Sequence, residues 1–209
     1  METAEERFNK LRKACWDKSF HCFALGYIFD KKAHRYGFFV NLLKVFGIIV
    51  PSAIGATALG YGLEAEILKY MIVIAIPLTI FQLIFSVIAV TNKWDDKLAY
   101  AYEASQDLNL MHDDFKKLGN LPPQDFNELN EKYELLNTRY KARSQQNSKQ
   151  NIKEWEQRMG MRFALRETQK KCVGCNETPV SMESTDCSVC GNFNSSIYYK
   201  MSLVSLNIC

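Results

Sequence analysis

Residues 70–91, YMIVIAIPLTIFQLIFSVIAVT, decide the fold because they contain no charged side chain over twenty-two positions. A second uncharged run of nineteen residues, VFGIIVPSAIGATALGYGL, occupies positions 45–63. A helix needs about 20 apolar residues to cross the roughly 30 Å hydrocarbon core of a bilayer. Both runs are therefore predicted to be transmembrane helices. The alternative is a pair of buried core helices, but a soluble bundle of this size rarely carries two uncharged runs so long.

The six residues between the two runs, EAEILK at 64–69, are too few for anything but a tight connection, so the runs are predicted to form an antiparallel hairpin. Lysine and arginine are enriched in cytoplasmic flanks of membrane helices. The basic residues that flank this hairpin are Lys31, Lys32, Arg35 and Lys44 before it and Lys93 and Lys97 after it. The connection itself carries one lysine and two glutamates. Both chain termini are therefore expected in the cytoplasm.

Four of the seven cysteines form two Cys-x-x-Cys pairs in the stretch CVGCNETPVSMESTDCSVC, residues 172–190. In a reducing cytoplasm such pairs favour metal binding over disulfides. The predicted ligands of one structural, tetrahedral Zn²⁺ are Cys172, Cys175, Cys187 and Cys190. Each pair is expected to end in a left-handed turn, at Asn176 and Gly191. A redox dithiol pair and an iron–sulfur site are the alternatives.

The rest of the chain has the apolar periodicity of helices. Two predicted seams are Phe8, Leu11, Cys15, Lys18, Cys22, Leu25 and Phe29, and Trp94, Lys97, Ala101, Ala104, Leu108, Met111, Phe115 and Leu118. The second apolar run is expected to continue as one helix of some 49 residues, 70–118, about 73 Å long at 1.5 Å per residue. A further helix is expected from Gln124, with the seam Phe126, Leu129, Tyr133, Leu136 and Tyr140. A break is expected at 143–151 and a last helix over 152–170.

These segments predict an all-α membrane protein, with a two-transmembrane helical hairpin, a cytoplasmic helical bundle and a small C-terminal zinc ribbon. The ribbon strand is expected over 195–206, SSIYYKMSLVSL. The predicted parts are an N-terminal amphipathic helix over 1–36, the hairpin over 37–91, cytoplasmic helices over 92–150, and the basic helix with the ribbon over 151–209. No Gly-rich phosphate loop, Gly-x-Ser-x-Gly elbow or His-Glu-x-x-His motif is present, so no enzymatic activity is expected.

Two faces within the hairpin carry functional hypotheses. Small residues recur every four positions in the first run, at Ser52, Ala56 and Gly60, and such a face lets helices pack closely. Polar side chains share a face of the second run, at Thr79, Gln82 and Ser86. These polar groups are expected either to bond to the other span within one hairpin or to line a channel. Two spans cannot enclose a channel alone, so a channel requires a homo-oligomer.

A basic stripe precedes the cysteines. Its members, at steps of four on the predicted helix, are Arg158, Arg162, Arg166 and Lys170. The arginine guanidinium suits phosphate and carboxylate partners. The stripe is interpreted either as a solvated face or as a site for an anionic partner such as RNA or DNA.

Two spans with a short link, an amphipathic helix before them and long helices after them resemble the SLATT proteins, two-transmembrane effectors of prokaryotic conflict systems. The two, eleven and two residue gaps between the four cysteines are similar to a mobile-element-encoded group named for that spacing. The resemblance implies an antiphage effector in the prokaryotic inner (cytoplasmic) membrane that oligomerises to permeabilise or depolarise it. It also implies a trigger from a nearby sensor or synthase of nucleotidyltransferase or reverse transcriptase type. One alternative is a membrane-anchored zinc-ribbon module that binds nucleic acid or protein without forming a pore. Another is a small transporter subunit or holin-like protein without a sensing role.

Overall fold

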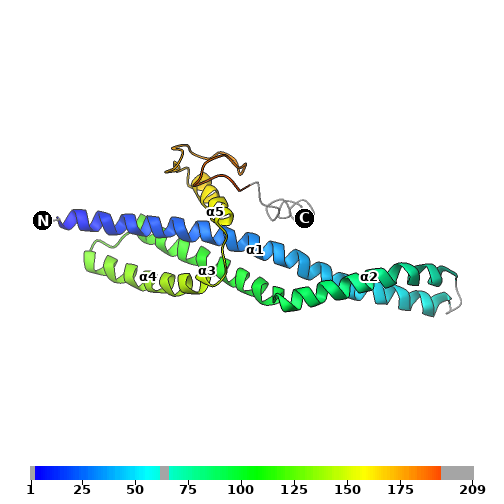
Figure 1. Ribbon diagram of the computed structural model, residues 1–209. Helices are drawn as coiled ribbons and strands as arrows, with labels where there is room; N and C mark the ends of the chain where they lie inside the picture. The colour runs from blue at the N-terminus through cyan, green and yellow to red at the C-terminus, as the bar shows by residue number, and fades with distance from the viewer. Residues whose placement is uncertain (1–2, 62–65, 194–209) are drawn as a thin grey trace. The chain divides into compact units, whose positions relative to one another are not determined.

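The computed structural model describes residues 3–61 and 66–193, which fold into helices joined by turns and contain no strand (Figure 1). The helices are α1 (Ala4–Tyr61), α2 (Glu66–Thr91), α3 (Trp94–Asn120), α4 (Phe126–Ser148) and α5 (Glu154–Glu167). The strand predicted over 195–206 lies outside the described residues. The helical character of the fold class is confirmed for the part of the chain that is described.

The chain divides into two compact units. One contains Met1–Lys32 together with Ala101–Cys209, and the other spans Ala33–Tyr100. The first unit thus holds the amphipathic helices and the cysteine pairs, whereas the second holds both apolar runs.

The single helix expected over 70–118 is wrong, because the chain breaks between α2 and α3. Lys93 has φ 53°, a left-handed conformation that a right-handed helix cannot contain. Asn92 closes the end of α2, where its side-chain amide donates to the carbonyl of Ile88 at 2.8 Å. Asp95 and Asp96 occupy the first turn of α3, where carboxylates stabilise a helix start.

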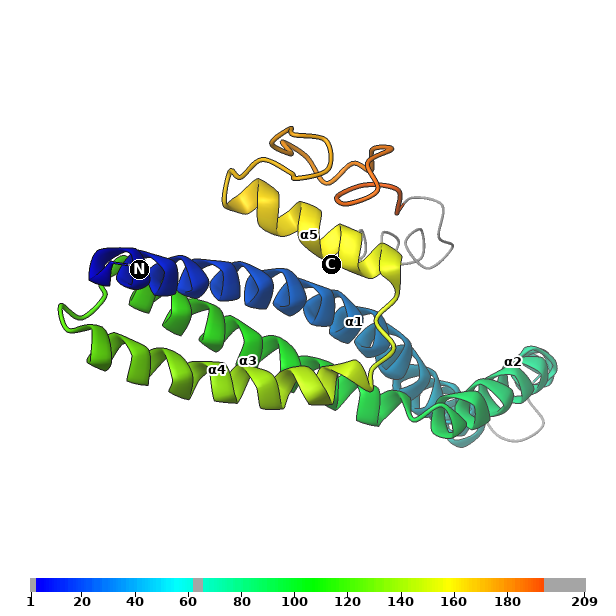
Figure 2. The same ribbon diagram turned by 60° about the vertical axis from the view of Figure 1, so that its left-hand side comes forward.

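The predicted seams form the core of the first unit. Within it, α3 and α4 lie side by side against the N-terminal part of α1 (Figure 2). The fully buried seam residues include Cys15, Cys22, Phe29, Ala104, Leu108, Met111, Phe115 and Leu129. Burial raises the pKa of the Cys15 thiol to about 11 and that of Cys22 to about 12, so both stay protonated at neutral pH. These two cysteines are core residues, as expected.

The break predicted over 143–151 is also largely wrong, since α4 continues to Ser148. Arg143 is buried, and its guanidinium bonds to Asp107 Oδ2 at 2.5 Å and to Glu103 Oε1 at 2.7 Å, both on α3. Arg139 also bonds to Asp107, with its Nη2 2.7 Å from Oδ1. Although partial burial opposes ionisation, these arginine hydrogen bonds lower the pKa of Asp107. The polar C-terminal part of α4 is therefore held on α3 by ion pairs, and the chain does not break there.

α5 lies on the opposite side of α1 from α4 (Figure 2). A buried ion pair joins α5 to α1, with Lys32 Nζ of α1 3.0 Å from Glu156 Oε2 of α5. Close backbone approach follows at Gly160, where an added Cβ would lie 2.7 Å from both the Ala24 carbonyl oxygen and the Ile28 side chain. Aromatic rings complete the contact, with Tyr27 and Phe163 stacked at a centroid distance of 3.9 Å.

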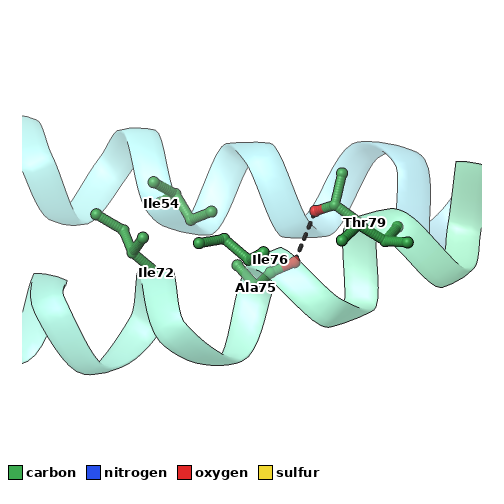
Figure 3. A pocket seen from close by; sticks show the side chains of 6 residues that line it. Ile54, Ile72, Ala75, Ile76 and Thr79 are labelled. Atoms are coloured by element: carbon green, nitrogen blue, oxygen red, sulfur yellow. Dashed lines mark hydrogen bonds between the residues drawn. The ribbon is translucent and has the colours of Figure 1, made fainter.

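In the second unit α1 and α2 form the predicted hairpin. The less exposed positions on α2 recur at alternating steps of three and four, at Leu68, Met71, Ala75, Leu78, Gln82, Phe85 and Ala89. A matching seam on α1 includes Gly47, which faces Gln82, and Thr57, whose hydroxyl donates to Met71 Sδ at 3.4 Å. A shallow apolar pocket lies along this seam, and Figure 3 shows Ile54 of α1 opposite residues of α2 there. The seam has the spacing of an antiparallel coiled coil.

The tight crossing at Gly160 gives the first prediction. Gly160→Ala places a methyl group against the backbone of α1, and overpacking of this kind costs about 1–3 kcal/mol. We expect faster amide hydrogen exchange throughout α5, measured on the full chain. Gly55→Ala is the matched control, because nothing lies within 4 Å of its added Cβ. Equal protection of α5 in Gly160→Ala and the wild type would contradict the packing described here.

Candidate metal centre

The two Cys-x-x-Cys pairs bring their four sulfur atoms together at the end of α5. All four Sγ atoms lie within 4.8 Å of one another. Cys172 and Cys187 are 3.9 Å apart at sulfur, and Cys175 and Cys190 are 3.8 Å apart. A tetrahedron with metal–sulfur bonds of about 2.3 Å has edges of about 3.8 Å. The predicted ligands therefore form a cluster of the right size for one tetrahedral ion.

Each pair sits in a tight turn of the same kind. The amide of Asn176 donates to the Cys172 carbonyl at 2.8 Å, and the amide of Gly191 donates to the Cys187 carbonyl at 2.9 Å. Within each turn a backbone amide also donates to the sulfur of the first cysteine. The Gly174 amide lies 3.3 Å from Cys172 Sγ, and the Val189 amide lies 3.4 Å from Cys187 Sγ. These turns have the form of the knuckles that hold metal ions in proteins, and amides that point at sulfur stabilise thiolates.

The residues after the two pairs differ from one another. Asn176 has φ 57° and takes the left-handed conformation that was expected. Gly191 does not, and the left-handed residue of the second knuckle is Asn192, with φ 53°. Gly191 is required for another reason, because a Cβ there would lie 2.1 Å from the Thr185 carbonyl oxygen. The left-handed conformation expected at Gly191 is thus wrong, and this position needs glycine because no side chain fits there.

The chemistry of the donor set fits a divalent cation. Backbone amides of Cys190 and Val189 lower the pKa of the Cys187 thiol to about 7. Burial raises the pKa of Cys190, because its thiolate would be a buried charge. A bound metal ion supplies the positive charge that lets all four thiols ionise together, and zinc suits a closed four-sulfur site. When bound, it would cross-link the two knuckles.

The predicted basic stripe is interrupted at Arg162. This side chain is buried, only 6% exposed, and is open neither to solvent nor to a partner. Its Nε donates to the Ser181 carbonyl at 2.8 Å. Its Nη1 lies 3.4 Å from both Thr185 Oγ1 and the Cys190 carbonyl oxygen, and 3.9 Å from Cys190 Sγ. This role was missed because step-four spacing predicts which helix face a residue lies on, but not which segment of the chain covers that face.

The other stripe members make separate contacts. Arg158 lies 3.5 Å from Glu154, and Arg166 bonds to Glu167. The Lys170 ammonium lies 5.2 Å from the centre of the Phe20 ring. The four residues therefore do not form one continuous exposed surface.

The hairpin candidates fall on two sides. Gln82 lies on the α2 seam and Ser86 is half-buried next to it. The Thr79 hydroxyl donates to the Ala75 carbonyl of its own helix at 2.7 Å. The small residues Ser52, Ala56 and Gly60 are exposed, on the side of α1 away from that seam. The small face is thus not used within the hairpin.

The described residues define a helical protein with a four-cysteine metal-type cluster and two helices long and apolar enough to cross a membrane. The chain belongs to the family of mobilome CxxCx(11)CxxC proteins, whose family model matches residues 12–193. The eleven-residue gap in that description is the one between Cys175 and Cys187. The match confirms the predicted mobile-element group, whereas the resemblance to SLATT proteins stays a prediction. No curated protein and no solved structure matches the chain.

Loss of one ligand gives the second prediction. Cys187→Ser should release about one equivalent of zinc per chain, because a three-sulfur site binds the ion far less tightly. We expect the segment 172–193 to become sensitive to protease while α1 and α2 remain intact. Ser188→Ala, a neighbouring exposed position, is the control. Purified wild-type protein that holds no metal and resists protease after cysteine alkylation would exclude the site.

Proposed function

We propose that the chain is a two-span membrane effector of a prokaryotic antiphage defence system, carried by mobile elements, with both termini in the cytoplasm. In this proposal it oligomerises and permeabilises or depolarises the inner membrane when a partner sensor or synthase triggers it. The observation that carries the proposal is the exposure of the apolar runs. The most apolar window of α1 is 0% buried and that of α2 is 6% buried.

Such exposure argues against the soluble-core alternative. Core helices of soluble proteins are covered by other elements, and monomeric soluble proteins rarely expose contiguous apolar patches larger than a few hundred Å². Here large aliphatic side chains are exposed along both helices, including Leu59 at 91%, Val90 at 77% and Val73 at 69%. Lipid would cover these groups.

Oligomerisation is supported by the small-residue face. Nothing lies within 4 Å of a Cβ added at Gly60, and Ser52 and Ala56 are exposed beside it. Association of membrane helices depends on close packing and not on apolar character, since lipid is equally apolar. A second copy could therefore approach this face closely without disturbing the hairpin seam.

The anchored binding module remains the second candidate, and the position of Gln82 favours it. Its side chain packs toward Gly47, where an added Cβ would lie 2.8 Å from Nε2. With Thr79 bonded within its own helix, two of the three polar groups proposed to line a channel make contacts inside one hairpin. In that case the spans are only an anchor.

The charge of the metal segment bears on the partner. Residues 172–193 contain Glu177, Glu183 and Asp186 and no lysine or arginine. Four thiolates with a divalent cation add two further negative charges, and nucleic acid affinity depends on positive charge. We therefore favour a protein over RNA or DNA as the partner held by this segment, encoded nearby as a nucleotidyltransferase or reverse transcriptase type of sensor or synthase.

Topology gives the third prediction. A phosphatase that is active only in the periplasm should be active when inserted at 64–69 and inactive when fused after residue 209. The physical reason is the excess of basic residues on the terminal side of both runs. A fusion inactive at both positions, with the chain in the soluble fraction, would contradict a membrane hairpin.

The oligomer gives the fourth prediction. Gly60→Leu should shift the detergent-solubilised protein toward monomer. It should also abolish depolarisation in triggered cells, which express the chain together with the sensor or synthase encoded nearby and are challenged with phage. Gly55→Leu is the matched control, because that glycine is equally open but lies on a different side of α1. An effector depolarises in the wild type and fails in Gly60→Leu. An anchored module leaves membrane potential unchanged in every variant, and an undisturbed oligomer in Gly60→Leu would refute the proposed face.

A further inference from the structure

We propose that Arg162 is a positioning residue of the metal centre and transmits metal occupancy to the docking of α5 on α1. The inference rests on contacts within the first unit and is independent of the membrane proposal. Arg162 is one of the few buried charged side chains of the described chain, and its guanidinium spans the boundary between a helix and the metal knuckles.

The acceptors of Arg162 all belong to the metal segment. They are the Ser181 carbonyl, Thr185 Oγ1, and the carbonyl and sulfur of Cys190. Cys190 is itself a predicted ligand, and Thr185 is held against the second knuckle by the Asn192 amide, which donates to its carbonyl at 2.6 Å. An ion that fixes the knuckles therefore also fixes the groups that satisfy the guanidinium.

The metal segment, residues 172–193, contains neither helix nor strand. Its buried side chains are those of Cys172, Pro179, Cys190 and Phe193. Leu165 of α5 forms a small core with Cys172 and Cys190, with Phe20 of α1 packed against it. Cys172 and Cys190 are thus both predicted metal ligands and part of the small core that packs against Leu165 of α5.

Without the ion these acceptors are free to move, and a buried guanidinium without acceptors is unfavourable. Arg162 would then turn toward solvent. The opposite side of α5 packs on α1 at Gly160, two residues earlier, so a shift of Arg162 would disturb that crossing. Coupling between two events is reciprocal. If the metal holds Arg162 in place, Arg162 must strengthen metal binding by the same factor.

The experiment measures both directions of the coupling on the full chain in detergent. Zinc affinity is determined by competition with a chromophoric chelator, and amide hydrogen exchange is followed in α5 and α4. Arg162→Gln should bind zinc roughly 10–100-fold more weakly, the range typical for residues that support metal ligands. Removing zinc from the wild type should speed exchange in α5 and leave α4 unchanged.

Matched controls lie on the same helix. Arg158→Gln and Arg166→Gln remove arginines whose ion-pair partners are within α5, and both should keep the wild-type zinc affinity. Zinc removal should change α5 exchange less in Arg162→Gln than in the wild type, because this variant lacks the side chain that couples the metal centre to α5. Wild-type zinc affinity in Arg162→Gln would overturn the proposal. So would unchanged α5 exchange after zinc removal from the wild type, a measurement that needs no folded variant.

Discussion

The N-terminal part of α1 has two opposite faces, and the other helices of its unit pack against them. One face carries Cys15, Cys22 and Phe29 toward α3 and α4. The other carries Ala24, Tyr27 and Ile28 toward α5. A helix with one apolar stripe needs a packing partner on that side only, whereas a helix with apolar residues on two opposite sides needs a packing partner on each. The docking of α5, and with it the location of the metal centre, depends on this second face.

α5 depends on its contacts for its stability. It has only 14 residues, and isolated helices shorter than about 12–15 residues are marginal in water. Its N-terminus is fixed by Glu156, which accepts from the Lys153 amide at 2.9 Å and pairs with Lys32. Its middle is fixed by Gly160 on one side and Arg162 on the other. The buried charges at Glu156 and Arg162 favour one docked position, because each loses its partner in any other.

Periodicity was sufficient to predict the seams and the hairpin, because apolar spacing is a local property of the chain. The cysteine spacing was likewise sufficient to predict that the four sulfur atoms come together in one cluster. The break at Lys93 was missed because it is a backbone conformation within an otherwise continuous helical pattern. The continuation of α4 past Arg143 was missed because the carboxylates that pair with this arginine lie on α3, about 40 positions away in sequence. Sequence spacing on one helix contains no information of that kind.

Arg162 shows the same limit at the functional site. Four basic residues at steps of four predicted one exposed stripe, but the segment after α5 returns over that helix and covers one of them. Burial of this arginine beside a cluster of thiols changes what the positive charge can do. At the surface it would attract phosphate groups, whereas beside the four cysteines it would offset the net negative charge of four thiolates that hold a divalent ion. Because Arg162 is buried in this way, the surface of α5 lacks one of the four positive charges that the step-four spacing predicted.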